Sequence, residues 1–194
     1  MRKFGSISLD TNVMLDIPAR AYLSSKGNLT PEETKMLKRT EDSLHTVIMC
    51  LTEQLRLKKV GVRVVEKELS RNPIMLEIYK SIFPFSVKKS ADTLQLAELY
   101  QRKIGIPAAD SLILATVSLE SVDVFLTWNK DDITNEKVQR EVEKINHGRR
   151  IKVPLFITPT FFMERLMLSE DRKTLCISPS PTPPVYRVHF SPSK

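Results

Sequence analysis

Hydrophobic and polar residues follow two patterns along this chain, short apolar runs and longer stretches with apolar residues three and four positions apart. The short runs predict strands at residues 6–9, 61–65, 122–127 and 153–158, and residues 83–87 also look extended. The longer stretches predict helices at residues 12–18, 31–58, 66–72, 74–82, 91–105, 107–120, 135–148 and 159–168. Strands therefore alternate with helices through most of the chain.

The alternation predicts an α/β fold, because strands separated by helices usually form a parallel sheet. We expect a three-layer sandwich in which helices flank a parallel sheet of about five strands. The run at 122–127 is apolar throughout, as is typical of a strand buried on both faces. After residue 168 the periodicity stops, and residues 169–194 are rich in Ser and Pro. The predicted organisation is one domain over residues 1–168 and an extended tail over 169–194.

The longest predicted helix has a clear start. Thr30 can cap it, Pro31 suits the first helical position, and Glu33 completes a capping box. Its apolar residues share one face, which predicts packing on a core.

Composition limits the possible settings and partners. The 194 residues are 41% hydrophobic and 27% charged, as in ordinary globular proteins. Two cysteines make no disulfide framework, the first residues lack the apolar run of a signal peptide, and no stretch approaches about 18 apolar residues. We therefore expect a cytoplasmic protein with no membrane partner. The net charge of +7 favours a polyanionic partner such as nucleic acid.

Acidic residues follow the predicted strands, where ligands bind in α/β sheets. Asp10 ends the first strand, Glu68 follows the second, and Asp110 begins an apolar helix. Taken singly, Asp10 suits a helix cap and Glu68 a solvated charge. A carboxylate at Asp110 is costly unless it caps, pairs or binds a cation.

Together these acids predict a metal site. Carboxylates that share one sheet edge repel each other, and a divalent cation stabilises such a cluster. Mg²⁺ or Mn²⁺ prefers hard oxygen ligands. Such an ion can lower the pKa of an attacking water and stabilise a leaving oxygen, which suits phosphodiester hydrolysis.

The segments "LDTNVMLD", "VVEKEL", "IPAADSLILATVSL" and "VFLTWNKDDI" resemble, in order, the motifs of PIN-domain ribonucleases. The closing "VPLFITPTFFMERL" is similar to that family's final strand and helix. The resemblance covers residues 3–168, and its nearest pattern is that of the VapC-like toxins of toxin–antitoxin pairs. It implies a PIN-like fold and a Mg²⁺- or Mn²⁺-dependent nuclease.

The resemblance also assigns roles to the acids. Asp10 matches the first acid and Asp110 the third, and both are expected to bind the metal directly. Glu68 matches the second acid and fits the motif better than Glu66.

Polar neighbours match the family pattern as well. Thr11 and Asn12 correspond to the pair that orients the first acid. Thr127 corresponds to the hydroxyl residue at the end of the fourth strand.

The fourth acid is where the chain departs from the family. Asn129 stands where many members have an acid, and others have one three residues later, at Asp132. We expect Asp132 to support the metal and Asn129 to line the site, with Asp131 a weaker candidate.

The resulting hypothesis is an endoribonuclease in which Asp10, Glu68, Asp110 and Asp132 are catalytic and hold the metal. RNA is the expected substrate, and a homodimer and an antitoxin protein are the expected partners. The long helix at 31–58 could serve either interface, although core packing is the simpler role. A short upstream reading frame with a DNA-binding N-terminus would favour the toxin interpretation.

Two rival hypotheses remain open. The first is a degenerate PIN module that binds RNA or protein without cleavage, which Asn129 motivates. The second is a phosphotransferase with an aspartyl nucleophile, but that chemistry needs an acid two residues after Asp10, where Asn12 stands. Trp128 could stack on a base, although filling the sheet edge is the simpler role.

Overall fold

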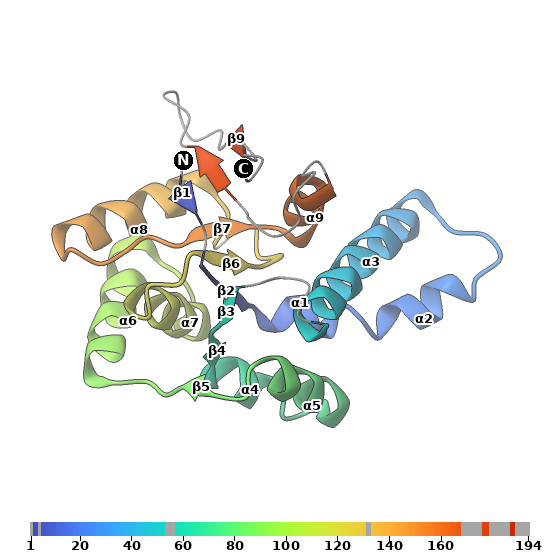
Figure 1. Ribbon diagram of the computed structural model, residues 1–194, viewed down its shortest axis with the longest axis horizontal. Helices are drawn as coiled ribbons and strands as arrows, with labels where there is room; N and C mark the ends of the chain where they lie inside the picture. The colour runs from blue at the N-terminus through green and yellow to red at the C-terminus, as the bar shows by residue number, and fades with distance from the viewer. Residues whose placement is uncertain are drawn as a thin grey trace, which may run out of the picture.

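The structure is a computed structural model that describes residues 2–3, 5–52, 57–130, 133–167, 176–178 and 187–188. Short strands alternate with longer helices through most of this part of the chain (Figure 1). The strands are β1 (Arg2–Lys3), β2 (Ser6–Leu9), β3 (Lys58–Lys59), β4 (Gly61–Val62), β5 (Ser86–Val87), β6 (Val124–Leu126), β7 (Leu155–Ile157), β8 (Cys176–Ser178) and β9 (Arg187–Val188). The helices are α1 (Thr11–Leu15), α2 (Ala19–Ser24), α3 (Pro31–Leu51), α4 (Arg63–Leu69), α5 (Pro73–Ile82), α6 (Ala91–Ile104), α7 (Ala108–Leu119), α8 (Glu136–Gly148) and α9 (Pro159–Met167).

The central sheet has four parallel strands in the order β3-β2-β6-β7. Leu9 on β2 pairs with Leu126 on β6, which in turn pairs with Ile157 on β7. The chain first moves from β2 to β3 on one side and later returns to β6 on the other. The strand order therefore reverses between β2 and β6, and parallel sheets bind ligands at the carboxyl end of such a reversal.

A second parallel pair, β4 with β5, adjoins the central sheet. Only Val60 separates β3 from β4, so residues 58–62 pair with β2 through their first half and with β5 through their second. The expected sheet of about five strands is thus divided into a four-stranded sheet and a two-stranded sheet that share this segment.

Helices cover both sides of the strands (Figure 1). One side carries α6, α7 and α8, where α6 contacts both of the others, and the other side carries α1, α3 and α9. This arrangement is α/β and compatible with a three-layer sandwich. Among the described helices, none combines the length and hydrophobicity needed to cross a membrane.

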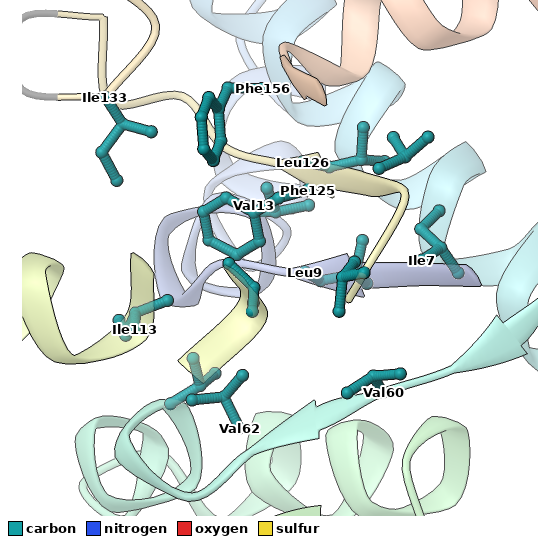
Figure 2. Packing of buried hydrophobic residues seen from close by; sticks show 14 of the residues in the cluster. Ile7, Leu9, Val13, Val60, Val62, Ile113, Phe125, Leu126, Ile133 and Phe156 are labelled. Atoms are coloured by element: carbon teal, nitrogen blue, oxygen red, sulfur yellow. The ribbon is translucent and has the colours of Figure 1, made fainter. Parts of the chain in front are cut away.

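The core lies between these layers. Figure 2 shows apolar side chains from β2, β4, β6, α1 and α7 packed together around the strands. Leu9, Val62, Ile113 and Phe125 are all fully buried. Burying such side chains contributes about 1.5–3 kcal/mol each, which makes this layer the main source of stability.

The capping box predicted at the start of α3 is confirmed. Thr30 accepts a hydrogen bond from the Glu33 backbone N–H at 3.2 Å, and the Glu33 carboxylate accepts from the Thr30 N–H at 3.0 Å. The other end of this helix was predicted wrongly, because α3 ends at Leu51 and Lys58–Lys59 form strand β3.

Two further boundaries differ from the prediction. The strand expected at residues 61–65 stops at Val62, and helix α4 begins at Arg63 because Val65 and Leu69 are buried on one helical face. Helix α2, after Pro18, was not predicted.

Parts of the expected tail form secondary structure. Strand β8 pairs antiparallel with β1 and with β9, so the two ends of the chain share a small three-stranded sheet. The predicted domain boundary near residue 168 lies outside the described residues.

Gly61 on β4 lies so close to β5 and to Phe83 that a side chain has no room there. A Cβ at this position would lie 2.6 Å from the Ser86 Oγ and 2.7 Å from the Phe83 Cβ. We predict that Gly61→Ala lowers the free energy of unfolding by about 1–3 kcal/mol, because the contact overpacks a buried site. Urea unfolding measures the change.

Gly27→Ala is the matched control, since no atom lies within 4 Å of its added Cβ. Its free energy of unfolding should stay level or rise slightly, because alanine restricts the unfolded chain. Equal unfolding midpoints for the two variants would contradict the described packing of Gly61.

Candidate functional site

Asp10 lies at the reversal of the strand order, directly after β2. Its backbone N–H continues the β2–β6 pairing and donates to the Leu126 carbonyl at 2.9 Å. Its side chain caps α1, where Oδ1 accepts from the Thr11 N–H at 2.8 Å. The residue is only 3% exposed, so its carboxyl group is held inside the protein.

Two side chains donate to the other oxygen of this carboxylate. The Thr127 hydroxyl donates to the Asp10 Oδ2 at 2.5 Å, and the Asn12 amide donates to the same oxygen at 2.8 Å. The Asn12 carbonyl oxygen accepts from the Trp128 N–H at 3.0 Å, which fixes the orientation of the amide. The structure thus brings Asn12 and Thr127 to Asp10 from α1 and from the end of β6.

The burial of Asp10 changes its acidity. Desolvation raises its pKa from 3.8 to about 7. The hydrogen bonds from Thr127 and the Thr11 backbone oppose this rise, whereas the charges of Asp110 and Glu68 add to it. Asp110 and Glu68 therefore both lie within electrostatic reach of Asp10, although the three acids are far apart in the sequence.

Asp110 lies in the first turn of α7 and is partly buried. Its Oδ2 accepts from the Asn129 amide at 3.1 Å. The Asn129 backbone N–H donates to the Thr127 Oγ1 at 3.0 Å. A continuous chain of hydrogen bonds thus runs from Asp110 through Asn129 and Thr127 to Asp10.

Glu68 lies on the exposed side of α4 and reaches the site through Thr11, whose hydroxyl donates to its Oε2. Glu66 is buried instead and pairs with Arg63 on the same helix. The charge of Glu68 is among the influences that raise the pKa of Asp10. The two glutamates therefore have different surroundings, and the structure brings Glu68 to the other acids.

Asp131 and Asp132 lie outside the described residues. Among the residues that are described, no three His, Cys, Asp or Glu side chains form a group that could hold a metal ion. What the site offers is two partly or fully buried carboxylates, Asp10 and Asp110, with Glu68 at its rim. This donor set suits Mg²⁺, which binds through one or two carboxylates and completes its shell with water and substrate phosphates.

Helix α3 contributes contacts that the sequence did not reveal. The indole N–H of Trp128 donates to the Ser43 hydroxyl at 2.8 Å, and the side chain is 8% exposed. The Arg39 guanidinium lies 4.9 Å from the Trp128 ring centroid and pairs with Asp16 at 2.5 Å. Trp128 thus fills the edge of the sheet and holds the loop after β6, which carries Asn129.

Comparisons with known proteins add no assignment. The chain matches no protein-family model, and no curated protein or solved structure is similar to it at a significant level.

The raised pKa of Asp10 predicts how stability depends on pH. The folded protein keeps the proton on Asp10 up to about pH 7, whereas the unfolded chain releases it near pH 3.8. The contribution of Asp10 to the free energy of unfolding is therefore fully present below about pH 3.8. It is lost as the pH rises from there toward 7. We predict that, because of Asp10, the free energy of unfolding of the metal-free protein falls by on the order of 2 kcal/mol between pH 5 and 8.

Asp10→Asn should remove this part of the pH dependence, since asparagine does not titrate. Urea unfolding in EDTA at several pH values, for the wild type and the variant side by side, measures the difference in slope. If the free energy of unfolding changes with pH in the same way for both proteins, Asp10 has the same pKa in the folded and the unfolded chain, and the prediction is wrong.

Proposed function

We propose that this chain is a metal-dependent endoribonuclease that hydrolyses RNA phosphodiester bonds. The observation that supports this most directly is the buried carboxyl group of Asp10, with a pKa raised to about 7, in the field of Asp110 and Glu68. An acid whose charged form is this unfavourable, with two further acids near it, is stabilised by a cation. A perturbed acid at the carboxyl edge of a sheet is typical of active sites.

The finer fold assignment, a PIN-like sandwich, belongs to the same proposal. Its support is the strand arrangement, in which β5, residues 58–62, β2, β6 and β7 follow one another across the two sheets. The order of the acids along the chain, together with Asn12 and Thr127 beside the first acid, agrees with the motifs that suggested the family.

Mg²⁺ or Mn²⁺ is the proposed cofactor. Asp10 and Asp110 would hold it, with Glu68 and Asp132 as the further acids. When bound, such an ion supplies a water of lowered pKa and stabilises the charge that develops on the leaving oxygen.

The residues around the acids keep them in position. Asn12 and Thr127 direct two donors at one oxygen of Asp10, so its carboxylate cannot rotate freely. The Asn129 amide holds one oxygen of Asp110 in the same way. Such outer partners typically contribute 10–100-fold in metal affinity or activity.

Asp10→Asn tests the proposal. We predict that it lowers Mn²⁺-dependent cleavage of single-stranded RNA by about a hundredfold or more, because the charge that holds the cation is lost. A fluorogenic RNA substrate measures the rate.

Asp92→Asn is the matched control, because it makes the same chemical change at an exposed position in the first turn of α6. Its cleavage rate should equal that of the wild type. Cleavage by Asp10→Asn at the wild-type rate would refute the assignment of the site.

A non-cleaving PIN module is the second candidate function. It is favoured by the neutral amide of Asn129 at the position of an acid and by the absence of a three-acid metal group among the described residues. Calorimetric titration with Mn²⁺ separates the two candidates. Binding at millimolar or lower concentration that is lost in Asp10→Asn supports the nuclease, whereas no binding to the wild type supports the module.

A toxin role, with an antitoxin partner and a homodimeric assembly, is part of the same proposal. Its support is the likeness of the motifs to VapC-like toxins. We predict that induced expression of the chain in a bacterial host arrests growth, while Asp10→Asn does not, because RNA cleavage depends on that acid. Growth curves with matched protein levels measure the effect, and equal arrest by both proteins would contradict it.

A further inference from the structure

A groove of about 280 Å³ lies between the end of α6 and the start of α8, two helices on the same side of the sheet (Figure 1). Lys103 and Ile106 contribute to one wall, and Asn135 and Lys137 contribute to the other. A second hollow continues along α8 and shares Asn135 and Lys137 with the first. The volume suits a single nucleotide unit of one strand better than a duplex.

Both walls of the groove are connected, along the chain or by hydrogen bonds, to Asp110. Ile106 lies four residues before Asp110, and its carbonyl accepts from the Ser111 hydroxyl at 3.1 Å, which fixes the turn into α7. On the other side, Asn135 follows Thr134, whose N–H donates to the Asn129 carbonyl at 3.0 Å. Because Asn129 in turn donates to Asp110, this wall is joined through Thr134 and Asn129 to one of the acids.

The charge balance in the groove is positive. Glu141 lines it but pairs with Lys144 at 2.6 Å, and Glu136 beside it pairs with Arg140 at 3.2 Å. These acids are therefore already neutralised by partners on their own helix.

Lys103 and Lys137 provide the remaining charge. Neither forms an ion pair with any residue that the structure describes, and both are exposed. Lys103 lies in the last turn of α6, where a cation is favoured by the helix dipole. Lys137 lies in the first turn of α8, where a cation is disfavoured, so helix stability does not explain it.

We propose that this groove, the α6–α8 groove, binds the phosphates of single-stranded RNA and leads the strand to the acids. Lys103 and Lys137 each contact a phosphate from opposite walls. The inference deepens the proposed function and rests on it for the identity of the substrate. Charged grooves that follow a backbone in this way bind strands with little sequence preference.

Lys103→Ala and Lys137→Ala test the proposal. Binding of a short fluorescein-labelled single-stranded RNA of mixed sequence is measured by anisotropy in EDTA, over a range of salt concentrations. Each variant should bind several-fold more weakly at low salt. The slope of log affinity against log salt should fall by about 0.7 for each phosphate contact removed.

Lys35→Ala is the matched control. Lys35 is an exposed lysine on α3, on the other side of the sheet, and its loss changes the net charge equally (Figure 1). Its salt slope should equal that of the wild type. Circular dichroism checks that all three variants are folded. We expect them to be, because alanine favours the helical conformation.

The outcomes separate this inference from the proposed function. If the wild type binds RNA through these lysines but does not cleave it with Mn²⁺, RNA binding in the α6–α8 groove is supported and the nuclease proposal fails. If the wild type cleaves RNA while both lysine variants keep its slope, the groove is refuted and the nuclease proposal stands. If the wild type binds no RNA, the proposal that the α6–α8 groove binds RNA is refuted.

Discussion

The architecture of the site depends on burying one carboxyl group, that of Asp10. Placing a charged carboxylate out of water is costly unless hydrogen bonds replace the lost hydration. Here the Thr11 backbone, Asn12 and Thr127 supply three donors. They do not cancel the cost, because desolvation remains the largest influence on the pKa of Asp10. The charged form of Asp10, at the carboxyl edge of the sheet, is therefore unfavourable in the absence of a compensating positive charge.

The register between β2 and β6 makes this arrangement possible. Leu9 pairs with Leu126, so the residues that follow them, Asp10 and Thr127, leave the sheet side by side. A slip of one residue would place the hydroxyl of Thr127 on the other face and remove its bond to Asp10. The apolar packing of the strands therefore determines the polar geometry at their ends.

Sequence reasoning was most successful where the information was local. The helix predicted at residues 91–105 ends at Ile104, before Gly105 with its positive φ of 84°, and Asp10 follows a strand as predicted, because neighbouring residues and periodicity determine both. Strand β3 was missed because two lysines give no apolar signal, and it forms only by pairing with β2. The bond from Trp128 to Ser43 joins positions 85 residues apart, so no local pattern could predict it. Elements can thus be predicted from spacing, whereas contacts across layers depend on the assembled fold.

The way in which the donors reach Asp10 has a consequence for the order of assembly. In small zinc domains the ion supplies the interactions that hold the chain together, so folding and loading are a single event. Here the Thr11 backbone, Asn12 and Thr127 donate to Asp10, and the core around β2 and β6 is apolar. If the proposed cation binds here, it would enter a site whose first acid is already held by the chain, so a change in cation supply would alter occupancy of the site more than folding of the protein.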